Sequence, residues 1–332
     1  MKTNITTKFA GLTLKSPIII GASGITGDTK HFKTFEENGA GAIVLKSIFE
    51  EEIIFEFNNF MKEAEEYGYD NEFLDYFDYK LKQDNITKYI DLIKAAKQEV
   101  NIPIIASVNC VSTHEWAYFT KKIEEAGADA LELNIFILPS DLTKSCTDME
   151  KTYFEIVEKV KAQINIPVVV KMSYYFSNLG KMIIDLSEKS DGLVLFNRFY
   201  NPDIDIKEKK IVNAKIFSTP DEILTPLRWV GISYGRVKSS LAATTGIHDG
   251  NGLIKMILAG ADAVEIVSTI YKNGPKVIKE MINDLENYMA ENGYETIEDM
   301  KGVASKQKAK NPAMYERAQF MRYFGDFDED IV

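Results

Sequence analysis

The sequence predicts an α/β fold, a parallel (β/α)8 or TIM barrel, on three observations. Eight short apolar runs alternate with helical patterns along the 332 residues. A helix end followed by glycine or aspartate and an apolar strand recurs at 38–45, 126–133, 190–195 and 259–266. An Asn-Ile-Pro turn followed by an apolar strand recurs at 101–108 and 165–172. A doubly wound open sheet is the alternative, but eight strands exceed its usual number.

The expected elements follow this order along the chain. Strands are predicted at 18–20, 42–45, 104–108, 130–133, 168–170, 192–196, 241–243 and 263–267. Helices are predicted near 31–38, 86–99, 116–126, 153–163, 179–189, 252–259 and 275–291. An N-terminal hairpin within 1–17 would cover the barrel floor, and 294–332 would be a C-terminal extension with two short helices. We interpret residues 1–332 as a single barrel domain.

Two predicted connections are too long to be simple turns, namely 48–83 after strand 2 and 201–237 after strand 6. Long loops in a compact barrel are usually lids or walls of a site. A surface insertion without a function is the alternative.

The composition excludes several classes of partner. A net charge of −11 and a pI near 5.0 argue against nucleic acid or an anionic membrane. Cys110 and Cys146 are too few for a disulfide framework or an iron–sulfur site, so no metal is expected. No targeting or membrane-spanning segment is evident. We therefore expect a cytoplasmic protein that acts on a small molecule, and a homodimer stays open.

Polar residues follow most of the predicted strands. In such barrels the active site lies at the carboxyl ends of the strands. The residues found there are Ser23, Lys46, Ser47, Asn109, Asn134, Lys171, Asn197, Arg198, Ser268 and Thr269. A lysine after an apolar run needs a polar partner or reaches solvent. The asparagine amides can both donate to and accept from a flat ring or cyclic amide.

The stretch 239–270 predicts a phosphate site, because it reads strand, glycine turn, helix, strand and then two hydroxyl residues. Exposed backbone N–H groups and helix N-termini at Gly246, Ser268 and Thr269 would point at an anion. A tight turn without a ligand is the alternative. A phosphate cradle, a lysine over the barrel mouth and an asparagine ring together describe an FMN site.

The chain resembles the dihydroorotate dehydrogenase family over nearly its whole length. The matching motifs are Ala22-Ser23-Gly24, Leu45-Lys46-Ser47, Leu133-Asn134, Val170-Lys171, Phe196-Asn197 and Thr245-Gly246-Ile247, followed by Ala259-Gly260-Ala261-Asp262. The resemblance implies bound FMN. It implies that Ala22, Ser23, Lys46, Asn109, Asn134 and Lys171 contact FMN or substrate, with Gly24, Ser47 and Thr245 beside them. It also implies that Asn197 contacts substrate and that Gly246, Ser268 and Thr269 hold the phosphate.

The departures from the family pattern concern the chemistry. The family has a Cys or Ser base after the fourth strand, where this chain has Ile137 or Leu138, and neither can accept a proton. Arg198 replaces a small hydroxyl residue and could clamp a substrate carboxylate. Thr245 stands where a glycine is usual. Substitute bases are sought among Ser140, Cys146, Tyr174 and Tyr175, and His114 and His248 stay open.

The leading hypothesis is an FMN-dependent oxidoreductase that acts on a CH–CH bond of a small cyclic or carboxylated, pyrimidine-like substrate. The missing base predicts poor oxidation of dihydroorotate itself, and the electron acceptor is unknown. One alternative is an aldolase or isomerase in which Lys171 or Lys46 forms a Schiff base on a phosphorylated substrate. The other is a protein that binds flavin or a metabolite without turnover.

Overall fold

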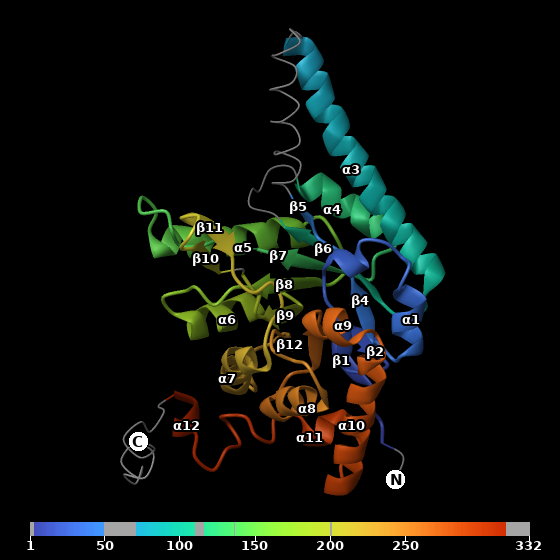
Figure 1. The fold of residues 1–332 in the computed structure, drawn as a ribbon, viewed down its shortest axis with the longest axis vertical. Helices are drawn as coiled ribbons and strands as arrows, with labels where there is room; N and C mark the ends of the chain where they lie inside the picture. Colours follow the sequence, from blue (N-terminus) through green and yellow to red (C-terminus); the bar gives the residue numbers. More distant parts are fainter. Residues whose placement is uncertain (1–2, 50–70, 110–115, 136, 200, 317–332) are drawn as a thin grey trace.

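Eight parallel strands close into a barrel, as predicted. The structure, a computed structural model, describes residues 3–49, 71–109, 116–135, 137–199 and 201–316 (Figure 1). The strands are β3 (Ile18–Ile20), β4 (Ala42–Val44), β6 (Ile104–Asn109), β7 (Ala130–Asn134), β8 (Val168–Met172), β9 (Gly192–Leu195), β12 (Ser240–Thr244) and β13 (Ala263–Ile266). They pair in the order β4-β3-β13-β12-β9-β8-β7-β6, and β6 pairs back to β4. A short strand, β5 (Ile48–Phe49), pairs farther along β6.

Helices surround the barrel (Figure 1). They are α1 (Phe32–Glu37), α3 (Asn71–Glu99), α4 (Trp116–Glu125), α5 (Cys146–Lys161), α6 (Leu179–Ser187), α7 (Leu224–Ser233), α8 (Gly250–Ala259), α9 (Ser268–Asn273), α10 (Val277–Asn292), α11 (Ile297–Met300) and α12 (Ala313–Glu316). There are also two 3-10 turns. The first, η1 (Gly24–Thr26), follows β3, and the second, η2 (Pro220–Ile223), precedes α7. None of these helices, in the ranges that the structure describes, combines the length and apolar character of a membrane span.

Two helices begin earlier than the sequence predicts. Helix α3 starts at Asn71, and its first half projects well beyond the barrel (Figure 1). Helix α5 starts at Cys146, because Ser145 and Asp148 form a capping box at its N-terminus. Cys146 therefore lies in a helical turn rather than in a loop, and its side chain is exposed. Most of the expected long connection after strand 2, residues 50–70, lies outside the described residues.

The aspartate of the recurring motif joins neighbouring strands. Asp129 accepts a hydrogen bond from the backbone N–H of Ile104 at 2.7 Å. Asp191 and Asp262 accept in the same way from Val168 at 2.8 Å and Leu241 at 2.7 Å. Each of these N–H groups belongs to the first or second residue of its strand. The aspartate of the repeated motif therefore binds the beginning of a neighbouring strand at three or more places around the barrel.

The floor of the barrel is closed by the predicted hairpin, β1 (Thr7–Phe9) and β2 (Leu12–Leu14). Its buried side chains Phe9, Ala10 and Leu14 pack on the inward-facing residues of the strands, among them Ile105 and Val169. These contacts remove apolar surface from water. The hairpin thereby fills the end of the barrel that lies opposite the carboxyl ends of the strands.

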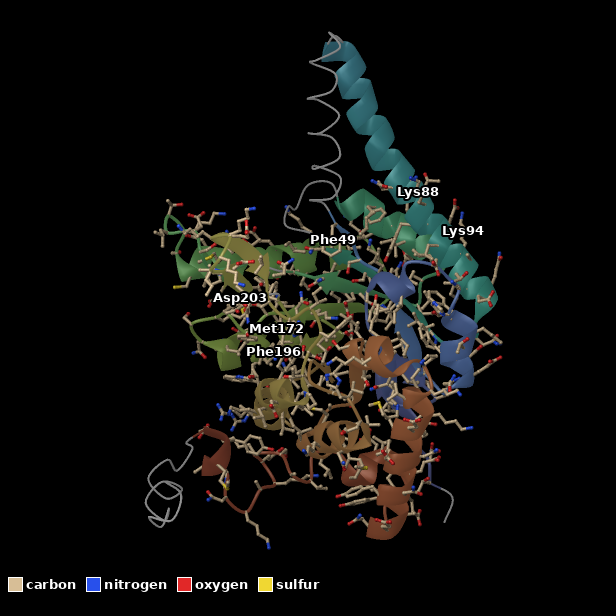
Figure 2. The ribbon with its side chains drawn as sticks, in the orientation of Figure 1. Phe49, Lys88, Lys94, Met172, Phe196 and Asp203 are labelled. Atoms are coloured by element: carbon tan, nitrogen blue, oxygen red, sulfur yellow. The ribbon has the colours of Figure 1, made fainter. Side chains whose placement is uncertain are left out.

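The connection from β9 to β12 carries structure of its own. A hairpin of β10 (Pro202–Asp205) and β11 (Lys210–Asn213) is followed by η2 and α7. Figure 2 shows Asp203 on this outer hairpin, whereas Met172 and Phe196 lie inside the molecule, where both are buried. Lys88 and Lys94 extend from α3 into solvent (Figure 2). The connection therefore stands beside the barrel mouth as a wall.

Candidate active site

Strand alternation aims the polar side chains into the barrel. Successive residues of a strand face opposite sides, so residues two apart share a face. Ile105, Ala130, Val169, Ala242 and Ala263 belong to the apolar interior cluster above the hairpin. Two positions farther along the same strands stand Ser107, Glu132, Lys171, Thr244 and Glu265. On these five strands the barrel interior thus changes from an apolar layer to a polar layer within two residues.

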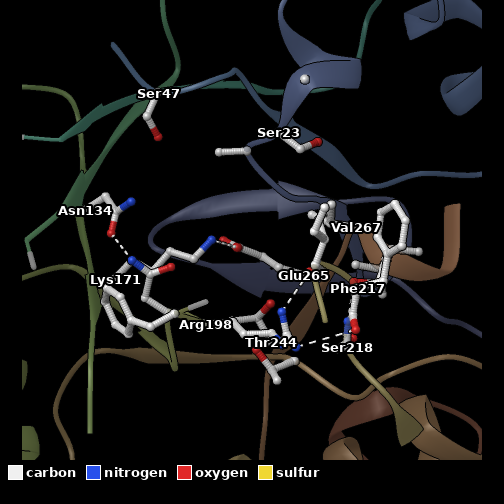
Figure 3. A pocket seen from close by; sticks show the side chains of 18 of the residues that line it. Ser23, Ser47, Asn134, Lys171, Arg198, Phe217, Ser218, Thr244, Glu265 and Val267 are labelled. Carbon is white, nitrogen blue, oxygen red and sulfur yellow. Dashed lines mark hydrogen bonds and ion pairs between the residues drawn. The ribbon is translucent and has the colours of Figure 1, made fainter. Parts of the chain in front are cut away.

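A cavity of about 650 Å³ opens above this polar layer (Figure 3). It is lined by all the predicted site residues except Ser140 and Thr269, namely Ala22, Ser23, Gly24, Lys46, Ser47, Asn109, Asn134, Lys171, Asn197, Arg198, Thr245, Gly246 and Ser268. Ser140 is exposed on the connection after β7. Thr269 is buried and donates to the backbone oxygen of His248 at 2.9 Å. The cavity has the size of a small-molecule or cofactor site.

Lys171 lies on the floor of the cavity between two carboxylates. Its Nζ is 2.6 Å from Glu265 Oε2 (Figure 3) and 3.6 Å from Glu132 Oε1. Burial by itself would lower the pKa of Lys171, but the charges of Glu132 and Glu265 outweigh it, so that the pKa lies above its ordinary value. Lys171 is therefore a buried cation at neutral pH, and its partners explain how an apolar run can end on lysine.

Neither glutamate of this pair is among the site residues predicted from the sequence. Each sits in the middle of a predicted apolar strand, in Ala130-Leu131-Glu132-Leu133 and in Ala263-Val264-Glu265-Ile266. Both are almost completely buried, with 1% and 2% of their surface exposed. A charged residue within an apolar strand of a barrel is itself a signal, because such a residue is rarely buried without a partner.

Asparagine amides form the upper rim of the cavity. Asn197 donates through Nδ2 to Asn134 Oδ1 at 2.5 Å, which joins the ends of β9 and β7. Asn109 is 9% exposed, and its buried Oδ1 has no hydrogen-bond partner among the described residues. A buried acceptor without a hydrogen-bond donor is energetically costly. Asn109 is therefore available to a donor on a bound molecule.

The turn predicted to bind a phosphate has backbone N–H groups without an acceptor among the described residues. Within the described part of the chain, the backbone N–H groups of Gly246 and Ile247 have no acceptor. The N-terminus of α8, in contrast, is capped by Asp249, which accepts from the N–H of Gly252 at 2.8 Å. An anion would thus be bound by the turn and by the hydroxyl of Ser268, rather than by the dipole of α8.

Gly246 is required for a reason that the sequence does not show. Its φ is +78°, and a Cβ added there would lie 2.1 Å from the backbone nitrogen of Ile223. The neighbour that demands glycine is therefore the chain of η2, not a ligand. Thr245 has φ +79°, a backbone conformation that is rare for a β-branched residue. Its hydroxyl donates to the backbone oxygen of Phe196 at 3.3 Å.

One side of the cavity is closed by residues 215–218, which we call the strap. Arg198 donates to the backbone oxygens of Ile216 at 2.7 Å and Lys215 at 3.0 Å. At its other end, Ser218 donates its N–H to Ser268 Oγ at 3.0 Å, and its backbone oxygen accepts from Lys272 at 2.7 Å. The strap is thus tied to both β9 and α9, and its Ile216, Phe217 and Ser218 line the cavity.

Arg198 is already bound within the protein. Its Nε donates to Glu222 Oε2 at 2.7 Å, in addition to the strap contacts. Although burial would raise the pKa of Glu222, hydrogen bonds from Arg198 and Thr219 hold that pKa below its ordinary value. A substrate carboxylate would have to compete with Glu222 for this guanidinium. The expected carboxylate clamp stays a prediction, whereas the contact with the strap is observed.

None of the candidate replacement bases that the structure describes lines the cavity. Ile137 packs against the core, and Leu138 is 49% exposed. Tyr174 also lies outside the lining, and its hydrogen bond to Tyr175, together with burial, raises its pKa to about 12. Burial and the nearby charge of Lys272 lower the pKa of His248, which bonds to Ser218 Oγ through Nε2 at 3.0 Å. Cys110 and His114 lie outside the described residues.

Side-chain geometry also bears on metals. Among the residues that the structure describes, no three His, Cys, Asp or Glu side chains are arranged to hold a metal ion. The two glutamates inside the barrel, Glu132 and Glu265, are instead paired with Lys171.

The fold and the cavity define an α/β-barrel enzyme whose active site lies at the carboxyl ends of its strands. A family model described as Dihydroorotate dehydrogenase matches residues 4–289. The chain therefore belongs to the dihydroorotate dehydrogenase family, and it is an oxidoreductase of the kind that acts on a CH–CH bond.

Relatives match over nearly the whole chain. A protein of Thermoplasma volcanium named dihydroorotate dehydrogenase B (NAD(+)), catalytic subunit, is 30% identical over 325 residues, which cover 92% of this chain and 99% of the relative. The protein of the same name from Thermoplasma acidophilum is 27% identical, with 91% and 99% covered. A crystal structure of DHODH from Eimeria tenella in complex with ferulenol superposes with a TM-score of 0.63 at 16% identity, over 90% of this chain and 88% of that one. This last likeness supports the fold.

Proposed function

We propose that this chain binds FMN and transfers hydride between the flavin and a small cyclic, pyrimidine-like substrate. The observation that carries the proposal is the buried Lys171 on the floor of a cavity whose rim is made of Asn109, Asn134 and Asn197. A fixed cation stabilises the negative charge that reduction places on a flavin ring. The amide rim suits a ring that both donates and accepts hydrogen bonds.

The residues present fit FMN at both ends. The orphaned Oδ1 of Asn109 is an acceptor for a ring N–H, and Lys171 is a donor and a cation on the cavity floor. The unpaired N–H groups of Gly246 and Ile247, with the hydroxyl of Ser268, would hold the phosphate. Bound FMN would supply the hydride-accepting chemistry, and this chain's residues would bind it, orient it and exclude water.

The Schiff-base alternative requires a neutral amine. Lys171 is held as an ammonium by Glu265 and Glu132, and its raised pKa removes the nucleophilic form at neutral pH. This favours flavin chemistry over an aldolase at Lys171. The absorption spectrum of the purified protein, before and after addition of FMN, tests the choice. Colourless protein that fails to bind added FMN would refute the proposal, and FAD in place of FMN would count against it.

We expect dihydroorotate itself to react slowly. A positioned general base contributes about 10²–10⁴-fold to such a step, and neither Ile137 nor Leu138 can serve as one. The test is anaerobic mixing of FMN-loaded protein with dihydroorotate while flavin bleaching is followed, with dithionite as the control for reducibility. Slow bleaching supports a changed substrate or a protein that binds flavin without turnover. Bleaching at about 1–10³ per second would show that another group supplies the base.

The route by which electrons leave is a separate part of the proposal. The two Thermoplasma relatives are named dihydroorotate dehydrogenase B (NAD(+)), catalytic subunit. Because these names give NAD(+) and a catalytic subunit, we infer that the present chain passes electrons onward, to an acceptor held by another protein. Reduced holoprotein mixed with NAD+ alone should then reoxidise slowly. Fast reoxidation by NAD+ alone would show that this chain binds the acceptor itself.

A further inference from the structure

Three charged side chains meet inside the barrel beneath the cavity. Lys171 of β8 lies between Glu265 of β13 and Glu132 of β7, with Nζ to oxygen distances of 2.6 Å and 3.6 Å. Lys171 is 7% exposed, and the two glutamates are less exposed still. We call Glu132, Lys171 and Glu265 the floor triad.

The two carboxyl groups of the floor triad approach the same ammonium. Nζ of Lys171 lies 2.6 Å from Glu265 Oε2 and 3.6 Å from Glu132 Oε1, and Glu132 Oε2 is buried without a hydrogen-bond partner among the described residues. Two ionised carboxylates so close together repel, and a hydrogen bond between them needs a proton. One ammonium cannot compensate two buried negative charges. Burial first, and then the charge of Glu265, raise the pKa of Glu132 well above its ordinary value.

Among the residues that the structure describes, Lys171 is the cation that forms ion pairs with these two carboxyl groups. Ser107 of β6 donates to Glu132 Oε1 at 3.4 Å and bonds to Ser47 Oγ at 2.8 Å. Tyr89 of α3 hydrogen-bonds to the backbone of Ser107, and it stays protonated because burial raises its pKa. Lys46 lines the same cavity from the end of β4. The neutral hydroxyls of Ser107 and Tyr89 cannot replace a missing positive charge.

We propose that Glu132 and Glu265 share a single proton, so that the floor triad carries one positive and one negative charge and is neutral overall. The ammonium of Lys171 then faces the cavity, although the floor triad as a whole carries no net charge. Glu132 and Glu265 act as positioning residues, because they work through Lys171. For the proposed flavin site this means that the floor stabilises the reduced ring less than a free lysine would.

The first test needs no cofactor. Infrared spectra of the purified chain at neutral pH should show the C=O stretch of a buried protonated carboxyl group. The band should vanish in Glu132→Gln and also in Glu265→Gln, because the remaining glutamate then pairs with Lys171 as a carboxylate. Glu222→Gln, which removes a carboxylate paired with Arg198 instead, should leave the band unchanged.

Each other outcome overturns the proposal. A parent protein without the band would mean that both carboxyls are ionised. A band that survives in Glu265→Gln would mean that Glu132 holds the proton alone. Both substitutions keep the shape of the side chain, and circular dichroism confirms that each variant is folded. If the infrared spectra do not show this behaviour while FMN still binds, the shared proton is wrong and the proposed function stands.

The second test rests on the proposed function and uses the FMN-loaded protein. Each single variant should change the flavin's midpoint potential little, because its triad stays neutral. The double variant Glu132→Gln/Glu265→Gln leaves Lys171 unpaired and should favour the reduced flavin at least tenfold, or about 30 mV for a two-electron couple. A large rise in both single variants would contradict the shared proton. If FMN does not bind, the proposed function is wrong. The infrared spectra would still show whether Glu132 and Glu265 share a proton.

Discussion

Arg198 and Glu222 form an ion pair, with Nε 2.7 Å from Oε2, that joins the end of β9 to η2 across 24 residues of chain. The same guanidinium binds backbone oxygens of the strap. One side chain therefore holds both η2 and the strap in place beside the cavity. The strap in turn reaches α9 through Ser218. Arg198 therefore shapes the site whether or not it also meets a substrate.

Replacement of Arg198 by Gln should loosen the strap. A hydrogen bond to a charged group contributes about 1.5–3 kcal/mol, so the Ser218 amide should exchange its hydrogen at least about tenfold faster. Arg228→Gln, on the exposed side of α7, is the matched control and should leave this exchange unchanged. Unchanged protection in Arg198→Gln would show that Ser268 and Lys272 hold the strap alone.

Replacement of Lys171 by Met should lower the flavin's reduction potential while FMN is retained, because the cation beneath the ring is lost. Breaking this buried pair should also cost about 3–5 kcal/mol of stability, since it leaves carboxyls without a counter-charge. Lys171→Met/Glu265→Gln should recover part of that stability. Lys301→Met is the control, because Lys301 pairs with Asp262 at the opposite end of β13. A potential that falls equally in the control would refute a specific role for Lys171.

The stability that this carboxyl pair contributes should fall as the pH rises above 4.5, because folding takes up a proton there. The pKa of Glu132 is raised well above 4.5 in the folded state, so the contribution of this group is complete below 4.5 and is lost progressively as the pH rises toward the folded pKa. Until the folded pKa is reached, the slope is about 1.4 kcal/mol per pH unit for one proton. Urea unfolding from pH 5 to 8 should give a flatter dependence for Glu132→Gln. Parallel curves for both proteins would exclude proton uptake at this site.

Replacement of Gly246 by Ala should destabilise the protein far more than replacement of Gly127 by Ala. Both glycines have positive φ, +78° and +93°, so both substitutions carry about 1–2 kcal/mol of backbone strain. Only at Gly246 does the added Cβ meet another backbone, 2.1 Å from the nitrogen of Ile223, which adds about 1–3 kcal/mol. Thermal unfolding of the two variants measures the difference. Equal losses would mean that η2 shifts freely and that Gly246 serves the phosphate alone.

The sequence by itself determined the barrel and the position of the cavity. Strand and helix periodicity are local properties, and the residue that follows each apolar run is placed at the barrel mouth by its position in the chain. Ser47, Asn109, Asn134 and Asn197 were found in this way, and all of them line the cavity. The repeated aspartates at Asp129, Asp191 and Asp262 were visible as a motif, although their role as acceptors for strand starts was not.

The tertiary structure decided which charges meet. Lys171 and Glu265 are 94 residues apart, and their contact depends on closure of the barrel and on the stagger of its strands. Arg198 finds Glu222, and Gly246 finds Ile223, because the β9 to β12 connection folds back over the mouth. A local pattern can mark a charged or flexible residue, but its partner is chosen by distances that exist only after folding. Pairing, burial and shared protons therefore belong to the three-dimensional structure, because electrostatic energy depends on separation in space.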